Sequence, residues 1–288
     1  MSSNIHIIEH QKTLERTLSF FKRADHNKAL GYIGAIVRLD LGFRTEKFPP
    51  KLNEFPFVFS AITHDLWNIS NLVTRLEWQR GISLTNPEYG KFWFHFAALD
   101  IEGLYIQYRS LCDYIATLIY CCFEEIDNVD FCSLKKLVTH LYKNQDSFPD
   151  RTLISIFRKS KLLVSEEKFY TSWFGHMREI RDNIAHSGSD PIVFGEPIDG
   201  ILFQVYKSGF KGTIPGLPHI KHNDNVVYFD KYFALQMSNL LVFIEDVSCY
   251  ISKKYNLYHH NAISTGFDTL YHWIAKFNEE LKNSPISS

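Results

Sequence analysis

Helical periodicity is the sequence feature that most limits what this chain can fold into. From Glu54 to Arg80 apolar residues recur every three or four positions, which places them on one face of a helix. We expect this helix to end at Gly81, since glycine is a common stop. A stripe of this length must pack against other apolar faces, so the pattern predicts helices packed on helices. The predicted stripe consists of Phe55, Phe59, Ile62, Leu66, Ile69, Val73 and Leu76.

A second long helix is predicted directly after the first. Its start signal is Asn86-Pro87-Glu88, which combines a capping residue, a proline at the first helical position and an acid in the first turn. We expect the helix to reach about Glu125, with a bend near Gly103. Its predicted core stripe consists of Leu104, Tyr108, Leu111, Ile115, Leu118 and Cys122.

The remaining helices are predicted from their caps, stops and apolar spacing. Two of them lie between residues 5 and about 43 and separate near Asp25-His26-Asn27, and a short helix follows Ser133. Three longer helices are predicted after that: one from Ser165 to Gly188, one from Tyr232 to about Lys254 that Asp230 caps, and a last one over 266–282. In the helix that ends at Gly188, the expected buried residues are Trp173, Met177, Ile180 and Ile184.

The composition changes after residue 188. Six of the 14 glycines and four of the 10 prolines lie between 188 and 218, and short β-like runs occupy 201–206 and 226–229. We therefore predict a small β insertion of two or three strands at about 191–229. The expected fold is mainly α: an antiparallel helical bundle over 86–288, with a helical region over 1–85 packing on it.

Charge and cysteine content limit the class of protein. Lys plus Arg number 31 and Asp plus Glu 32, for a net charge of −1, so any contact with nucleic acid must be local rather than spread over a basic surface. The five cysteines show no metal-ligand or disulfide spacing, which suits reduced thiols. The first residues lack the apolar core of a signal peptide, and the apolar run at 114–123 is about half a membrane span. We expect a soluble, cytoplasmic protein.

The segment Arg181-Asp182-Asn183-Ile184-Ala185-His186 carries the clearest chemical signal. Histidine titrates near neutral pH, so it can accept or donate a proton, and the C-terminal end of a helix favours its charged form. Arginine stays charged and presents a fork of donors that fits phosphate oxygens. These groups suit cleavage of RNA by its own 2′-hydroxyl without a metal, and we expect no cofactor. The pairs His219/His222 and His259/His260 lack a carboxylate or Cys ligand at fixed helical spacing, so they do not predict a metal site.

The spacing of Arg181 and His186 matters for this chemistry. Residues five apart lie about 140° around a regular helix, so the two side chains do not share one face. Either the length of Arg181 or unwinding before Gly188 would bring them together within one chain. A second copy related by a two-fold axis would place two arginines and two histidines round one phosphate. One histidine would then act as the base and the other as the acid.

The segment resembles the signature of the HEPN superfamily, which is Arg, a polar residue, three to five further residues and then His. Arg181, Asp182 and His186 match it at the shortest spacing. The resemblance implies an antiparallel helical bundle that forms a homodimer. It also implies a metal-independent endoribonuclease of toxin–antitoxin or antiphage type, with Arg181 and His186 catalytic and Asp182 and Asn183 positioning them. Gly188 stands where the variants that a nucleotidyltransferase antitoxin neutralises carry Tyr, so that control mechanism is not implied, although another antitoxin or regulatory protein remains an expected partner.

The helix around Tyr108–Tyr114 looks like the polar-bearing helix that faces the signature in such bundles, so Arg109 and Asp113 are predicted to support the site. An ordinary intrahelical ion pair explains their four-residue spacing equally well. Two other functions stay open: an inactive member of the family that binds nucleotide or RNA or serves as a scaffold, and an unrelated helical protein that assembles with partners.

Overall fold

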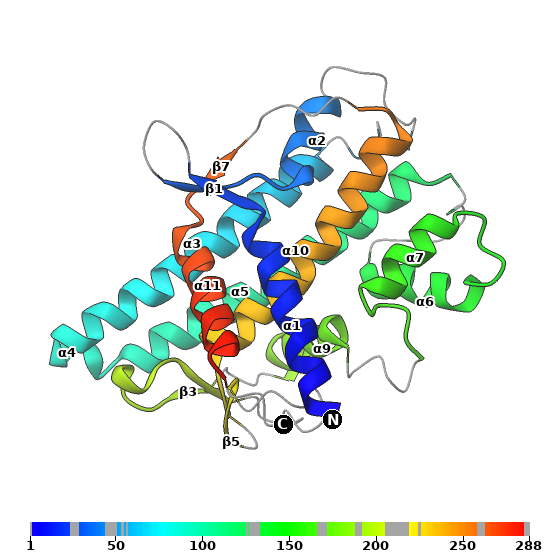
Figure 1. Cartoon of the computed structure of the whole chain (residues 1–288). Coiled ribbons are helices and arrows are strands. Elements are labelled where there is room, and N and C mark those ends of the chain that lie inside the picture. Colours follow the sequence, from blue (N-terminus) through cyan, green and yellow to red (C-terminus); the bar gives the residue numbers. More distant parts are fainter. Residues whose placement is uncertain are drawn as a thin grey trace.

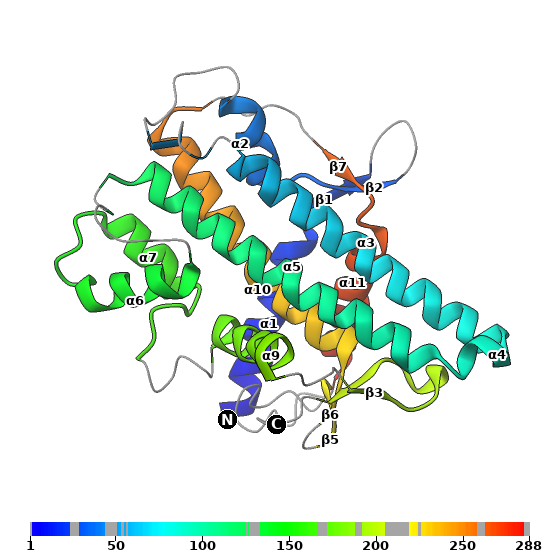
Figure 2. The ribbon, with the colours of Figure 1, turned by 180° about the vertical axis from the view of Figure 1, so that it is seen from behind.

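Two long antiparallel helices form one layer of the fold. A computed structural model gives the structure of residues 2–23, 29–43, 51–52, 55, 57–124, 126, 133–165, 172–187, 192–204, 219–223, 226–257 and 263–284, with the main chain alone for 2–6, 40–43 and 185–187. The helices α3 (Val58–Thr85) and α5 (Trp93–Cys122) lie side by side in this layer, as Figure 2 shows from behind. The predicted stripe on α3 is confirmed from Phe59 to Leu76, because these apolar residues are buried.

The predicted end of α3 is wrong. The helix continues through Gly81 to Thr85, and the space where a side chain at Gly81 would start is empty within 4 Å. The amide of Asn86 donates to the carbonyl of Ile82 at 2.8 Å and closes the last turn. Gly81 is exposed, so neither packing nor backbone conformation requires the helix to stop there.

The start signal at Asn86 is confirmed, but the helix that it opens is short. The side chain of Asn86 accepts hydrogen bonds from the amides of Glu88 and Tyr89 at the start of α4 (Pro87–Gly90). The chain then turns, and α5 begins at Trp93, which this turn places in the core with 1% of its surface exposed. The helix is continuous through Gly103, where a β-carbon would lie 3.3 Å from Leu72 of α3, so this glycine lets the two helices approach.

The second layer packs on the first and contains α10 (Phe229–Lys254), α1 (Ser2–Leu18), α2 (Ala35–Phe43) and α11 (Asp268–Lys282) (Figure 1). The two predicted N-terminal helices are therefore confirmed. Asp230 does not cap α10: Tyr228 holds the cap position and Asp230 lies in the first turn, where its charge suits the helix dipole. Two further helices form a lobe beside α10. The first, α6 (Leu134–Asn144), is capped by Ser133 as predicted, and the second, α7 (Arg151–Lys159), was not predicted.

The structure confirms the β insertion and gives it four strands rather than two or three. They are β3 (Ile192–Phe194), β4 (Leu202–Gln204), β5 (Lys221–Asn223) and β6 (Val226–Tyr228), in the antiparallel order β3-β4-β6-β5. Residues 205–218, including part of the predicted run at 201–206, lie outside the described residues.

A second small sheet was not predicted. It joins β1 (Phe21–Arg23) and β2 (Leu30–Tyr32) to β7 (Ser264–Thr265), which comes from the far end of the chain. Strands of two or three residues are too short to show an alternating pattern in the sequence. Gly31 lies where β2 meets β7, and a β-carbon there would lie 2.3 Å from the side chain of Ile263.

One hydrophobic core joins residues from both sides of the predicted boundary at 85/86, and that boundary stays a prediction. Cys112, Cys121 and Cys122 are buried in this core, and Cys249 is partly buried; all four are free thiols, and Cys132 lies outside the described residues. Burial raises the pKa of the Cys112 and Cys122 thiols. Among the helices that the structure describes, none has both the length and the apolar character needed to cross a bilayer. The fold is mainly α, as predicted.

Candidate functional site

The helix α9 (Trp173–Ser187) carries the Arg-to-His segment and lies between α5 and α10 (Figure 2). Of the four residues expected to be buried, Met177 and Ile180 are, whereas Trp173 and Ile184 are partly buried against the same core. The indole of Trp173 donates to the carbonyl of Ser160 at 2.8 Å, which ties the start of α9 to the end of α7. The predicted start at Ser165-Glu166-Glu167 and the stop at Gly188 fall largely or wholly on residues outside the described ranges.

Two arginines share the carboxylate of Asp182. The guanidinium of Arg181 donates to one oxygen at 3.1 Å, and that of Arg178 lies 2.9 Å from the other. The side chain of Arg181 is 30% exposed, so a ligand can reach it from solvent. Both ion pairs are partly buried, since the side chain of Asp182 is 27% exposed and that of Arg178 is 21% exposed.

The predicted supporting pair faces this group from α5. The guanidinium of Arg109 donates to Asp113 at 2.6 Å and lies over the ring of Phe174, 5.8 Å from its centre. The same oxygen of Asp113 accepts the amide of Leu134 at 3.0 Å, which fixes the start of α6. The pair is therefore the intrahelical ion pair that its spacing allows, and it also joins α5 to α6 and α9.

The charge of Arg181 on α9 acts on the carboxyl of Asp113 on α5, and the two helices pack against one another. Burial raises the pKa of the Asp113 carboxyl above its ordinary value, and the charge of Arg109, the Leu134 amide and the charge of Arg181 oppose that rise. Arg109 and Asp113 thus pair on α5, and Arg181 and Asp182 pair on α9, the helix that packs against it. Arg178 adds a second guanidinium group at the carboxylate of Asp182, so two cations share this one carboxylate on α9.

Arg178 is a member of this group that the prediction missed. Positions 178, 182 and 186 are four residues apart, so they follow one ridge of the helix. This spacing could have been read from the sequence, because Arg178 and Asp182 form an ordinary pair one turn apart.

The structure gives less detail for His186 and Asn183 than for Arg181 and Asp182. Asn183 is partly buried on α9, and His186 lies in the last turn, where the structure describes only its main chain. The helix is regular as far as Ser187, so unwinding before that residue does not bring position 186 towards Arg181. Within one chain the two positions remain about 140° apart around the helix. A shared site therefore requires either a long reach by Arg181 or a second copy.

A second histidine on α9, His176, was also missed. It is 2% exposed, and its Nδ1 lies 2.5 Å from the hydroxyl of Tyr232 on α10. Burial lowers the pKa of His176 to about 4, which keeps its imidazole neutral at physiological pH. A neutral, buried ring suits a structural link between α9 and α10 rather than proton transfer to a substrate.

The part of the chain that the structure covers holds no group of three or more His, Cys, Asp or Glu side chains that could bind a metal ion. His219 contacts the hydroxyl of Ser284 at 3.0 Å, whereas His259 and His260 lie outside the described residues. Comparisons with family models, with curated proteins and with solved structures find no match for this chain.

Proposed function

We propose that this chain is a HEPN-like endoribonuclease that cuts RNA without a metal and works as a homodimer. The observation that carries the proposal is that α9, which bears the Arg181–Asp182 pair, packs against α5, which bears the Arg109–Asp113 pair. The resemblance of the Arg-to-His segment implies such a facing polar helix.

The proposed reaction needs only the groups of the RNA and of two protein copies. The 2′-oxygen forms a bond to the neighbouring phosphorus while the bond from phosphorus to the 5′-oxygen breaks. The imidazole of His186 in one copy takes the proton of the 2′-hydroxyl, and the imidazolium of His186 in the other gives a proton to the departing oxygen. The products are a 2′,3′-cyclic phosphate and a 5′-hydroxyl.

In this proposal the arginines stabilise the charge that builds up on the phosphate. Arg181 is the residue that contacts the phosphate oxygens, and Asp182 holds its guanidinium in place between turnovers. Arg109 and Asp113 act as positioning residues, because their ion pair fixes the surface of α5 against which Arg181 lies.

An inactive module that binds RNA or nucleotide is the second candidate. The observation that favours it is that Arg109 and Arg181 are each bonded to a carboxylate of the same chain. Such pairs would let the site hold a phosphate without organising it for attack. The two candidates agree on phosphate binding and differ only in cleavage.

The experiment that separates them incubates the purified protein with mixed RNA in EDTA. The enzyme proposal predicts cleavage that survives EDTA, is lost in His186→Ala and persists in His95→Ala, a matched change of an exposed histidine on α5. Binding of RNA without cleavage would support the inactive module. Cleavage that EDTA abolishes, or that His186→Ala retains, would contradict the enzyme proposal.

A further inference from the structure

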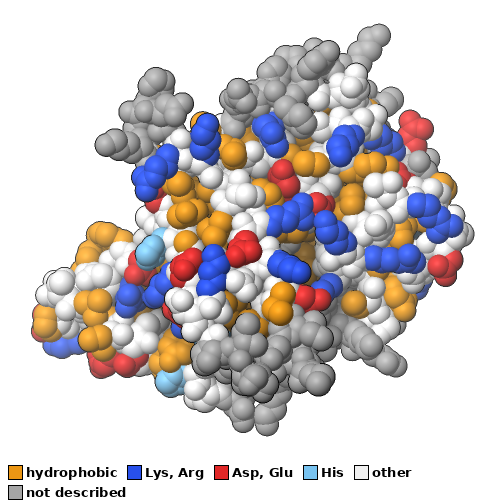
Figure 3. Space-filling model, in the orientation of Figure 1, with side chains coloured by type: hydrophobic (Ala, Val, Ile, Leu, Met, Phe, Trp, Pro, Cys, Tyr) orange, Lys and Arg blue, Asp and Glu red, His pale blue; other side chains and the backbone are white. Residues whose placement is uncertain are grey.

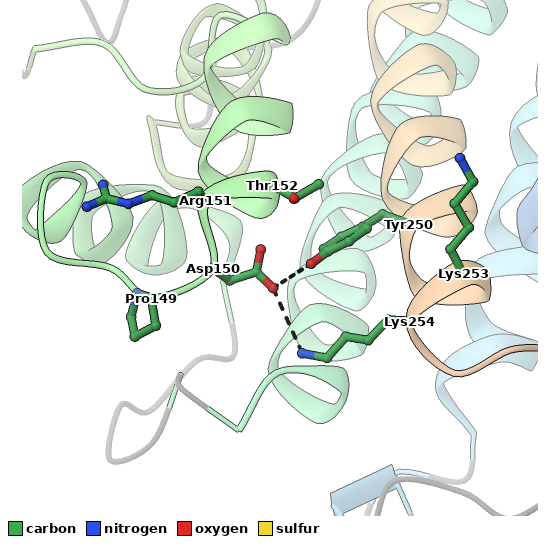
Figure 4. A pocket seen from close by; sticks show the side chains of 7 residues that line it. All are labelled: Pro149, Asp150, Arg151, Thr152, Tyr250, Lys253 and Lys254. Atoms are coloured by element: carbon green, nitrogen blue, oxygen red, sulfur yellow. Dashed lines mark hydrogen bonds and ion pairs between the residues drawn. The ribbon is translucent and has the colours of Figure 1, made fainter.

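A groove lies between the N-terminal turn of α7 and the last turns of α10, away from the site on α9 (Figure 4). Two hollows of about 550 and 450 Å³ adjoin there, since Thr152, Tyr250 and Lys253 line both. The groove and the Arg181 site share no residue, because the groove is lined from α7 and α10 and from Pro149 and Asp150 before α7, whereas Arg181 and Asp182 belong to α9.

The charged residues that line the groove are mainly basic. Four cationic side chains belong to it, against the two carboxylates of Asp150 and Asp246. The cationic residues are Arg151, Lys159, Lys253 and Lys254. Figure 3 shows Lys and Arg side chains spread over the face where α1 and α10 lie. Since the chain as a whole is nearly neutral, this region is a local concentration of positive charge.

Both oxygens of the Asp150 carboxylate already accept hydrogen bonds from neighbouring residues. One oxygen accepts the amide of Leu153 at 2.8 Å and so caps α7. The other accepts the hydroxyl of Tyr250 at 2.7 Å, with the ammonium of Lys254 at 3.9 Å (Figure 4). This carboxylate holds the two walls of the groove together and has little capacity left to neutralise the other lysines.

Both oxygens of the Asp246 carboxylate also have partners. Both of its oxygens receive the guanidinium of Arg16 on α1, and Lys159 lies 3.4 Å away. Burial would raise the pKa of Asp246, but the hydrogen bond and charge of Arg16 and the charge of Lys159 outweigh it and hold the pKa below its ordinary value. The carboxylate is thus ionised and already paired at neutral pH.

Two of these cations have no carboxylate of their own, and Figure 4 shows the side chain of Arg151 pointing away from Tyr250. Arg151 donates to the main-chain carbonyls of Gln145 and Asp146, at 3.0 and 2.7 Å, which orients its guanidinium but does not neutralise it. Lys253 is exposed, and within the described ranges no residue forms a hydrogen bond or ion pair with its ammonium group. The amides of Arg151 and Thr152, in the first turn of α7, add donors that have no partner within the helix.

We propose that this groove holds the backbone of single-stranded RNA. It is open to solvent and lined by charged residues as well as apolar ones, unlike an enclosed apolar ligand pocket. From Asp246 to Lys254 it follows α10 for roughly 12 Å, long enough for more than one phosphate. The identity of the ligand rests on the proposed function, whereas the positive charge of the groove does not.

The test measures binding of a labelled 2′-O-methyl RNA strand, which cannot be cleaved, by fluorescence anisotropy of the full chain. The groove variant is Lys159→Gln with Lys253→Gln, and the matched control is Lys22→Gln with Lys91→Gln, two exposed lysines far from α7. Two lost phosphate contacts should weaken binding about tenfold and reduce the slope of log K against log salt by about 1.4 between roughly 50 and 200 mM salt. The control variant should bind as the wild type does.

An unchanged affinity and salt slope in the groove variant would overturn the proposal. So would displacement of the RNA by poly-glutamate of equal charge, or by inorganic phosphate at equal phosphate concentration, because the groove would then bind any anion. Because the RNA cannot be cut, failure here leaves the cleavage result in EDTA untouched. A dead catalytic site would equally leave the binding result intact.

Discussion

The guanidinium of Arg109 lies 2.6 Å from the carboxylate of Asp113, and this pair stands where α5 meets both α6 and α9. Both side chains are largely buried, with 15% and 28% of their surfaces exposed. Removing one partner leaves the other poorly solvated, which costs more than removing both.

A double-mutant cycle on Arg109→Ala and Asp113→Ala tests this relationship. Each single variant should lower the free energy of unfolding by about 1–3 kcal/mol, and the double variant should lose less than the sum by about 1 kcal/mol. Urea unfolding of the four proteins measures the coupling. Effects that add to within about 0.3 kcal/mol would show that the pair is not a unit.

The pKa of His176 predicts a loss of stability in acid. Its folded-state pKa of about 4 lies below the ordinary value of 6.5, so the unfolded chain binds the proton more readily. The contribution of the neutral ring is fully present above pH 6.5 and is lost as the pH falls from there to about 4. It amounts to about 3 kcal/mol.

The readout for His176 is a comparison with His176→Asn, which keeps an acceptor for Tyr232 but does not titrate. Urea unfolding at several pH values should show the advantage of the wild type shrinking by about 3 kcal/mol between pH 7 and pH 4. If the free energies of unfolding of the two proteins change in parallel with pH, burial does not lower the pKa of His176.

Gly81 offers a substitution that should raise stability. It lies in the interior of α3, is exposed and has no atom within 4 Å of where a β-carbon would lie. Gly81→Ala should therefore add about 0.5–1 kcal/mol, because alanine loses less backbone entropy in a helix. The contrasting variant is Gly266→Ala, which should destabilise the protein because Gly266 has φ +96°. Thermal unfolding measures both, and a lower melting temperature for Gly81→Ala would show that α3 ends earlier than described.

The helices could be predicted because their apolar stripes are long. The stripe on α3 repeats over about five turns, so its period is clear even though the end of the helix is not. Gly81 and the turn before Trp93 were misplaced because helix ends depend on packing: an exposed glycine can stay helical, and Trp93 needs a break to reach the core. The β1-β2-β7 sheet could not be read, since β7 joins from the other end of the chain.

The site could be predicted from the sequence where the interacting residues lie close together along the chain. Arg109 and Asp113 are one turn apart, and so are Arg178 and Asp182, although the second pair was overlooked. The packing of α9 on α5 was expected only from the order of helices in the family that the segment resembles. The burial of His176 could not be foreseen, because it depends on Tyr232 of α10.

Arg178 should matter more for cleavage than for stability. Arg178→Gln removes one of the two cations on Asp182 and the charge that it adds beside the phosphate. We expect RNA cleavage to fall by tenfold or more, equivalent to about 1.4 kcal/mol in the barrier, with the melting temperature nearly unchanged. The rate of RNA cleavage in EDTA, measured beside Arg23→Gln as an exposed control, decides this. Equal rates for the two variants would remove Arg178 from the site.

The most direct test of the account mixes wild-type chains with His186→Ala chains in varying proportion and follows RNA cleavage in EDTA. If each site takes one histidine from either copy, only dimers of two wild-type chains are active. Cleavage at constant total protein should then fall with the square of the wild-type fraction. A rate proportional to the wild-type fraction would show that one chain suffices and would contradict the shared site, and no cleavage at any proportion would contradict the enzyme itself.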